Sequence, residues 1–226
     1  MAKKISIAID GPAGAGKSTI ARRLAKELGY MYVDTGAIYS TVAYFMDTWG
    51  ISPKDADGIQ RYIDELNIDI WYDETGLQHM YMNNIDVTED IRTQEISQKA
   101  SLISAHACVR EMLLDMQRDI AREYDVVMDG RDIGTVVLPK ATLKIFLTAS
   151  AEVRAKRRTD ELIAKGQKAD YQKILKEIQQ RDYQDTHREI APLKMSRDSI
   201  KVDTSDMDID QVVSTIRELL RKKVGA

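Results

Sequence analysis

The 226-residue sequence predicts an α/β fold, in which a parallel sheet of about five strands is flanked by helices. A small antiparallel β insert and a helical lid complete the predicted fold. Short apolar runs alternate with longer segments whose apolar residues recur every three or four positions, which is the order of strand–helix–strand units. Residues 67–88 instead alternate between apolar and polar, which is typical of antiparallel strands. The sequence therefore predicts one main sheet and a separate β-rich insertion.

Five apolar runs are the predicted strands of the main sheet. Parallel strands are covered by helices on both faces, so their residues are apolar almost throughout. In chain order the runs are residues 5–9, 31–33, 125–129, 143–148 and 199–203. The insert is predicted as a hairpin of residues 68–72 and 77–82, with a third short strand at residues 85–87.

Helices are predicted in the segments between these strands. The first ends at Gly29, since glycine accepts the left-handed backbone of a helix terminus. Ser52 and Pro53 predict the start of another helix, because serine can cap a helix and proline fits its first turn. Trp49 and Trp71 fall at periodic positions, which favours packing over stacking on a base. The other predicted helical segments are residues 38–50, 93–123 with a break near His106, 151–165, 171–187 and 209–222.

Composition excludes several classes of protein. A formal net charge of −3 argues against a nucleic-acid coat or a protein of the membrane surface. The single cysteine, Cys108, excludes a disulfide framework, and the three histidines have no partners at metal-site spacing. No signal-peptide pattern and no bilayer-spanning apolar stretch is found. We therefore expect a monomer in the cytoplasm, with no nucleic-acid or membrane partner.

The most informative stretch is DGPAGAGKST, residues 10–19. Its spacing and its place between a strand and a helix meet the full pattern of a phosphate-binding loop. Glycines let backbone N–H groups turn toward phosphate oxygens at a helix N-terminus, and Lys17 can bridge the β- and γ-phosphates of ATP. The Ser18 hydroxyl can ligate Mg²⁺. The alternative is a glycine-rich turn that only caps a helix. The predicted ATP-binding residues here are Gly11, Pro12, Ala13, Gly14, Ala15, Gly16, Lys17, Ser18 and Thr19.

Another predicted strand ends in the turn Asp129-Gly130-Arg131-Asp132, and ligands of such sheets bind at strand ends. Asp129 is predicted to hold Mg²⁺ through a water molecule, although many strands end in an aspartate that only begins a turn. Arg131 offers a planar fork for a phosphate, and Asp132 can accept hydrogen bonds from a base or sugar. An internal Arg131–Asp132 ion pair is the equal alternative.

Two charged helices in the second half carry a cluster of basic residues. Such a run is often a solvated helix face. Phosphoryl transfer, however, spreads negative charge that arginines stabilise, and two helices around a glycine turn can close as a lid. The lid is the favoured interpretation. The basic residues are Arg154, Lys156, Arg157, Arg158, Arg181 and Arg188.

Together these residues resemble the bacterial cytidylate kinase family of nucleoside monophosphate kinases, over essentially the whole chain. The motifs that carry the resemblance are IDGPAGAGKST (9–19), DTGAIY (34–39), DIRTQEIS (90–97), VRE (109–111), DGRDIGTVV (129–137), KIFLTAS (144–150), the spaced Arg181, Asp182, Asp185 and Arg188, and APL (191–193). The resemblance implies Mg²⁺-assisted transfer of the γ-phosphate of ATP to CMP or dCMP, in pyrimidine metabolism. It also implies three parts of one domain: a core (1–66, 93–149 and 189–226), a monophosphate-binding insert (67–92) and a lid (150–188).

The resemblance also implies roles for single residues. Those implied to be catalytic are Lys17, Arg131, Arg181 and Arg188, and Arg157 in the lid is implied to bind ATP. Those implied to bind CMP are Thr35, Gly36, Tyr39, Ser101, Arg110, Arg131, Asp132, Asp185 and Arg188. The family usually has an arginine directly after the tyrosine of DTGAIY, where this chain has Ser40. The clamp on the acceptor phosphate is then one positive charge short, unless another basic residue substitutes.

Two rival functions stay open. A kinase of the same fold could act on UMP, AMP or shikimate. A nucleotide-sensing module could use the phosphate-binding loop without transfer, although it would have no need of a second phosphate site. A Ras-like GTPase is excluded, because the guanine-reading motif Asn-Lys-x-Asp does not occur.

Overall fold

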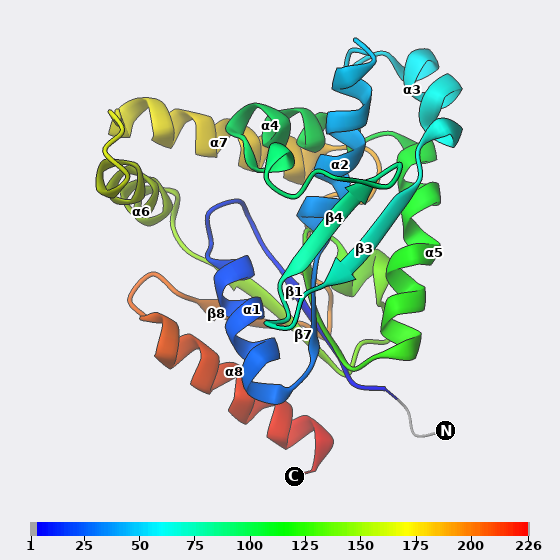
Figure 1. Ribbon diagram of the computed structural model, residues 1–226. Coiled ribbons are helices and arrows are strands. Elements are labelled where there is room, and N and C mark those ends of the chain that lie inside the picture. The colour runs from blue at the N-terminus through cyan, green and yellow to red at the C-terminus, as the bar shows by residue number, and fades with distance from the viewer. Residues whose placement is uncertain (1–3, 226) are drawn as a thin grey trace.

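The computed structural model describes residues 4–225 and contains a five-stranded parallel sheet in the order β2-β6-β1-β7-β8 (Figure 1). Each strand lies within one or two residues of a predicted run, so the predicted sheet is confirmed. Because neighbouring strands are all parallel, their carboxyl ends meet at one edge, which carries Asp10, Asp34 and Asp129. The strands are β1 (Ser6–Asp10), β2 (Met31–Asp34), β6 (Val126–Gly130), β7 (Leu143–Thr148) and β8 (Ile200–Asp203).

Helices cover both faces of this sheet, and each face has its own apolar core. The helices are α1 (Lys17–Leu28), α2 (Thr35–Thr48), α3 (Ala56–Tyr62), α4 (Gln94–Ile103), α5 (Ala107–Glu123), α6 (Ala151–Ala164), α7 (Tyr171–His187) and α8 (Ile209–Val224). On one face α1 and α8 pack around Leu24 and Ile216. On the other, α2, α4 and α5 pack around Phe45 and Met128. The break between α4 and α5 falls at His106, as predicted.

The insert is a three-stranded antiparallel sheet of β3 (Ile68–Tyr72), β4 (Gln78–Met82) and β5 (Ile85–Asp86), which confirms the predicted hairpin and third strand. Gln78 joins it to the main sheet. The buried side-chain oxygen of Gln78 accepts a hydrogen bond from the backbone N–H of Asp34 at 2.8 Å, and its amide donates to the Asp34 carbonyl at 3.3 Å. The insert is therefore fastened to the carboxyl end of β2.

The predicted start of the third helix is wrong. Helix α3 begins after Asp55, whose carboxylate accepts a hydrogen bond from the backbone N–H of Gly58 at 2.9 Å. Ser52 instead forms a turn, in which its hydroxyl accepts from the N–H of Lys54 at 3.3 Å. Aspartate caps a helix about as well as serine, and here Asp55 takes that role, so the helix starts later than the Ser-Pro pair suggests.

The two tryptophans pack against neighbouring side chains, as predicted, but at the surface. Trp49 and Trp71 are each 56 % exposed. Trp49 rests on the ring of Tyr62 at 5.2 Å, and Trp71 lies beside His79 at 5.7 Å between ring centroids. Each ring thus has one apolar contact face and one face in water, which a periodic pattern alone does not distinguish from full burial.

Helices α6 and α7 form a pair that projects to one side of the sheet (Figure 1). Arg154 of α6 is buried at the base of this pair. Its guanidinium donates to the Ala13 carbonyl at 2.9 Å and to the Ala149 carbonyl at 2.9 Å. It also forms a two-point ion pair with Asp182 of α7, at 3.0 and 2.5 Å. Arg154 therefore ties both helices to the phosphate-binding loop.

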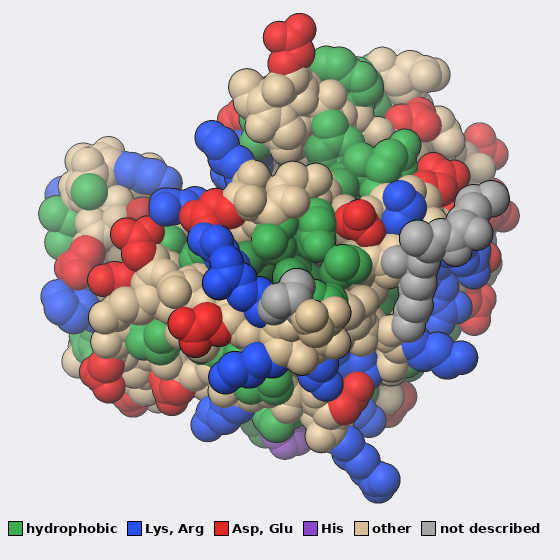
Figure 2. Space-filling model, turned by 90° about the horizontal axis from the view of Figure 1, so that it is seen from below, with side chains coloured by type: hydrophobic (Ala, Val, Ile, Leu, Met, Phe, Trp, Pro, Cys, Tyr) green, Lys and Arg blue, Asp and Glu red, His purple; other side chains and the backbone are tan. Residues whose placement is uncertain are grey.

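The surface has charges of both signs. Figure 2 shows one face, on which lysine and arginine side chains are interspersed with acidic ones around a group of apolar side chains. In the part of the chain that the structure describes, no helix is long and apolar enough to cross a membrane.

Candidate active site

A cavity of about 490 Å³ opens at the carboxyl edge of the sheet, between the phosphate-binding loop, the insert and helix α7. Its walls bring together motifs that lie far apart in the sequence. The predicted site residues that line it are Ala13, Gly14, Lys17, Ser18, Thr35, Gly36, Tyr39, Ser101, Arg110, Asp129, Arg131, Asp132, Arg181, Asp185 and Arg188. The predicted loop residues outside its walls are Gly11, Pro12, Ala15, Gly16 and Thr19.

The phosphate-binding loop has a backbone that requires glycine. A Cβ atom at Gly11 would lie 1.9 Å from the carbonyl oxygen of Leu147, so the loop passes directly against β7. Gly14 and Gly16 have φ angles of +74° and +84°, which L side chains rarely adopt. Helix α1 then begins at Lys17, and no side chain among residues 4–225 caps it. Its first N–H groups are left for an anion such as a phosphate.

Lys17 lies in the floor of the cavity. Its Nζ atom donates to the carbonyl oxygen of Pro12 at 2.8 Å. Burial, together with the charge of Arg131, lowers the pKa of Lys17 to about 7, although Asp129 and Asp185 act in the opposite direction. A phosphate beside this nitrogen would favour its charged form.

Asp129 is held by two hydroxyl groups. Ser18 donates to one carboxylate oxygen at 3.0 Å and Tyr32 to the other at 2.9 Å. Burial raises the pKa of Asp129 to about 6, and the charge of Asp34 adds to the effect. Residues 4–225 contain no group of three acidic, histidine or cysteine side chains that could hold a metal alone. A hydroxyl beside one carboxylate suits Mg²⁺, which keeps several waters and binds substrate phosphates.

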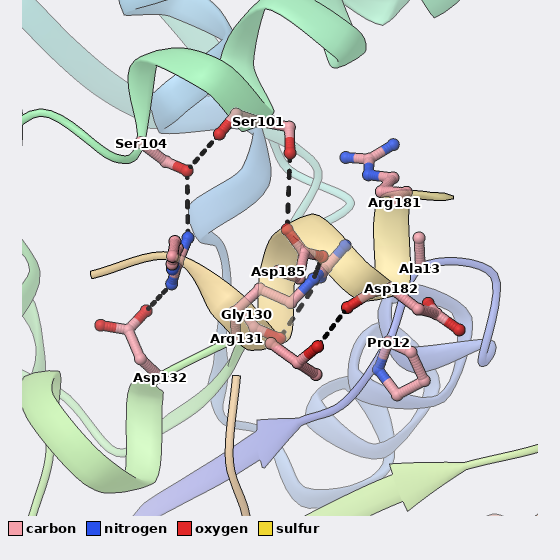
Figure 3. Close-up of polar contacts among 12 residues, drawn as sticks. Pro12, Ala13, Ser101, Ser104, Gly130, Arg131, Asp132, Arg181, Asp182 and Asp185 are labelled. Atoms are coloured by element: carbon pink, nitrogen blue, oxygen red, sulfur yellow. Dashed lines mark hydrogen bonds and ion pairs between the residues drawn. The ribbon is translucent and has the colours of Figure 1, made fainter. Parts of the chain in front are cut away.

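The opposite wall consists of paired arginines and aspartates (Figure 3). The Nε atom of Arg131 donates to Asp185 at 2.8 Å, and the Ser101 hydroxyl donates to the other oxygen of Asp185 at 3.4 Å. Burial acts to raise the pKa of Asp185, but the charge and hydrogen bond of Arg131, together with the charges of Arg181 and Arg188, outweigh it, and the pKa falls below its ordinary value. Asp185 thus stays charged and fixes Arg131 at the cavity.

Asp132 pairs with an arginine from a different helix. Its carboxylate forms a buried ion pair with Arg110 of α5, whose guanidinium lies 5.8 Å from the ring centre of Tyr39. Burial raises the pKa of Asp132, although Arg110 opposes that shift. No Arg131–Asp132 ion pair forms in the described chain, so the alternative of an internal pair at this turn is wrong.

Two arginine nitrogens are buried at the cavity without a hydrogen-bond partner among residues 4–225. They are Nε of Arg181 and one terminal nitrogen, Nη2, of Arg188. Arg181 also donates to the Ser97 hydroxyl at 3.2 Å. Burial lowers the pKa of both guanidinium groups. Unsatisfied buried donors are costly, so these nitrogens fit an anionic ligand.

Of two further residues singled out in the sequence, Ser40 lines the cavity and Arg157 does not. Arg157 does not reach the cavity, because its guanidinium donates to the hydroxyl of Thr204 at 3.2 Å and to the Thr204 carbonyl at 2.5 Å. Ser40 lines the cavity and is buried. Arg22 and Arg92 line the same cavity, so basic residues other than an arginine at position 40 are present there.

Sequence reasoning gave no role to Asp10. Its buried carboxylate accepts hydrogen bonds from the N–H groups of Ile133 and Gly134, each at 2.7 Å, and so holds the turn that follows Asp132. Burial raises the pKa of Asp10 to about 6. Its position at a strand end was the available signal.

Tyr32 and Ser104 also received no role. The only sequence signal for Tyr32 is a hydroxyl inside an otherwise apolar strand. Ser104 lies among small and apolar residues and gives no signal at all.

Comparison with known proteins identifies the family. A family model for cytidylate kinase matches residues 7–222. A cytidylate kinase from Caldicellulosiruptor saccharolyticus is 48% identical over 223 residues, which are 99% of this chain and 98% of that protein. Another from an Exiguobacterium species is 46% identical over 222 residues, which are 98% of this chain and 99% of that protein. The crystal structure of an uncharacterized protein from Eubacterium ventriosum shares the fold, with a TM-score of 0.52 at 15% identity across 96% of this chain and 98% of that one. The chain belongs to the cytidylate kinase family, as its motifs predict.

Proposed function

We propose that this protein transfers the γ-phosphate of ATP to CMP or dCMP, which gives ADP and CDP or dCDP. The observation that carries the proposal is one cavity with two basic walls. Lys17 and the uncapped start of α1 form one wall, and Arg131, Arg181 and Arg188 form the other. A nucleotide sensor needs only the first wall, so the second favours a kinase.

ATP is proposed to bind along the phosphate-binding loop, with its phosphates between the N–H groups of α1 and Lys17. Ser18 and Asp129 would hold Mg²⁺, Asp129 through a water molecule, because their oxygens lie together at the end of β6. When bound, Mg²⁺ would neutralise charge on the phosphates. Arg157 would reach ATP only after leaving Thr204, so we assign it to a closed position of the lid.

CMP is proposed to bind against the acceptor wall. Cytosine carries an exocyclic amino group where uracil carries an oxygen, and a carboxylate accepts from the first and repels the second. Asp132 is therefore the proposed reader of the base, with Ser101 and Arg110 beside it. Arg131 and Arg188 would clamp the acceptor phosphate. The remaining proposed contacts of CMP are Thr35, Gly36, Tyr39 and Asp185.

The proposed reaction needs no general base. The second pKa of a nucleoside monophosphate is about 6, so near neutral pH its phosphate already carries ionised oxygens that can attack. The protein then aligns the two phosphates, places Lys17, Arg131, Arg181 and Arg188 around the transferring group, and excludes water when the lid closes.

The proposal keeps the division into a core, an insert of residues 67–92 and a lid of residues 150–188. Two contacts support this division, because each joins one part to the core. Gln78 fastens the insert to β2, and Arg154 fastens α6 and α7 to the phosphate-binding loop. A monomeric state and a cytoplasmic location stay predictions of the sequence.

A coupled assay of ADP release tests the proposal with CMP, dCMP, UMP, AMP and shikimate as acceptors. We expect CMP and dCMP to give the highest kcat/KM. Faster turnover of UMP, AMP or shikimate would show that this molecule, rather than CMP, is the preferred acceptor. Tight ATP binding with no acceptor-stimulated ADP release would favour the nucleotide-sensing module.

A further inference from the structure

Ser104, the residue that follows α4, contacts both arginines that flank Asp132. Figure 3 shows its position between Ser101 and Asp132. Ser104 is buried, and its hydroxyl donates to the Ser101 carbonyl at 2.8 Å. The hydroxyl proton is thereby occupied, so its oxygen acts as an acceptor. It accepts from Nη1 of Arg188 at 3.0 Å. The Ser104 carbonyl accepts from Arg110 at 3.2 Å.

Arg188 is therefore held at two points away from Asp132. Besides the bond to Ser104, its Nε atom donates to the carbonyl of Ala191 at 2.7 Å. Its remaining nitrogen, Nη2, stops 3.6 Å from Oδ1 of Asp132, beyond hydrogen-bonding distance. That nitrogen is fully buried and has no hydrogen-bond partner within the described residues. Arg188 and Asp132 therefore form an ion pair without a hydrogen bond between them.

The separation between Arg188 and Asp132 affects which hydrogen bonds the Asp132 carboxylate can accept from a ligand. One of its oxygens, Oδ2, is taken by Arg110. The other, Oδ1, accepts no hydrogen bond from any residue between 4 and 225. If Arg188 moved onto Oδ1, each oxygen would already accept from an arginine, and an amino group of a ligand would have to share Oδ1 with a bulky guanidinium.

We propose that Ser104 is a specificity-determining positioning residue, whose hydroxyl holds Arg188 short of Asp132 and so keeps Oδ1 free for the amino group of cytosine. This inference rests on the proposed function, because it needs Asp132 to read the base. Ser104 acts through Arg188 and Asp132 rather than on the reacting phosphates.

The test compares Ser104→Ala with wild-type protein, using CMP and UMP as acceptors at saturating ATP. Loss of a hydrogen bond to a charged group predicts a fall of about tenfold in kcat/KM for CMP. The fall for UMP should be smaller, because uracil offers no amino group to Oδ1, so the CMP-to-UMP ratio falls. Ser104→Thr keeps the hydroxyl and should keep most of the wild-type ratio.

The matched control is Thr48→Ala. Thr48 makes the same kind of bond at the end of α2, from its hydroxyl to the Phe45 carbonyl at 2.8 Å, but it does not line the cavity. This variant should keep the wild-type ratio, and thermal melting shows whether each variant is folded. An unchanged CMP-to-UMP ratio in Ser104→Ala, or equal losses for both acceptors, would overturn the role of Ser104. A wild-type enzyme without preference for CMP would instead overturn base reading by Asp132, and with it the proposed function.

Discussion

The two walls of the cavity are built in different ways. The donor wall is part of one continuous loop, residues 11–19, of which Ala13, Gly14, Lys17 and Ser18 line the cavity, and its shape comes from glycine backbones and a helix terminus. The acceptor wall consists of side chains from α4, α5, α7 and the turn after β6, held by ion pairs such as Arg110–Asp132 and Arg131–Asp185. A wall made of backbone depends on local sequence. A wall made of paired side chains depends on the whole fold, and each residue of it can be tuned separately.

The largest effect is expected in the donor wall, at its one charged side chain. Lys17→Ala should lower kcat about a thousandfold, because a preorganised charge on the transferring phosphate is lost. The side chain makes one hydrogen bond to the loop backbone, at the Pro12 carbonyl, while glycine geometry shapes the rest, so the melting temperature should fall only slightly. Steady-state kinetics with CMP measure the loss. Lys26→Ala, an exposed lysine on the same helix, is the control. Rates close to wild type in Lys17→Ala would contradict the assignment of the donor wall.

Asp10 connects the two walls, because it precedes the donor loop and its carboxylate holds the turn of the acceptor wall. Burial raises its pKa to about 6 from the ordinary 3.8, so the folded protein binds this proton more tightly than the unfolded chain. The cost of the buried charge is absent below pH 3.8 and complete above pH 6. Wild-type stability from this group therefore falls as the pH rises through that window.

The variant Asp10→Asn cannot titrate at this position. Its free energy of unfolding, relative to wild type, should rise by about 2 kcal/mol between pH 4 and pH 6, because each pKa unit corresponds to about 1.36 kcal/mol and the two ends of the titration fall outside that range. Urea denaturation of both proteins at several pH values measures the difference. Parallel pH profiles would show that Asp10 is not buried as a charge.

Asp132→Ala addresses the acceptor wall alone. It should raise the KM for CMP about a hundredfold, because the base loses its acceptor and Arg110 loses its buried partner. The KM for ATP should change little, since the donor wall does not use this side chain. Measuring the KM for CMP and the KM for ATP in the same variant shows which wall the substitution affects. Equal losses for CMP and ATP would assign Asp132 to the structure of the turn instead.

The smallest effect is a gain of function. Ser40 is buried and lines the cavity, so we expect the guanidinium of Ser40→Arg to extend into the cavity, where the acceptor phosphate is proposed to bind. One added charge-assisted hydrogen bond should lower the KM for CMP about fivefold. Ser40→Gln has similar reach without the charge and should not reproduce the gain. A constant that is unchanged or raised in Ser40→Arg would show that residues such as Arg92 already complete the clamp.

The same contrast explains what the sequence could predict. The donor loop was found from its spacing, because all of its determinants lie within ten residues. The strands and most helices followed from periodicity, although the cap at Asp55 and the exposed faces of the tryptophans did not.

In the acceptor wall, residues such as Arg131 and Asp132 were identified mainly through the family resemblance. Their partners were not predicted, because Asp185 lies 54 residues from Arg131 and Arg110 lies 22 residues from Asp132. The roles of Asp10 and Ser104 depend on contacts across 123 and 84 residues, which no local pattern encodes.

The buried Arg154 has a consequence for rates. Its guanidinium joins the Ala13 carbonyl, in the donor loop, to Asp182 on the second lid helix. If residues 150–188 move together as the proposed lid, the bond to Asp182 stays within the lid, and opening must break the bond from Arg154 to the Ala13 carbonyl. If departure of ADP requires this opening, the loss of that hydrogen bond contributes to its activation barrier. The rate of turnover would then depend on Arg154, a residue outside the proposed binding sites of both nucleotide bases.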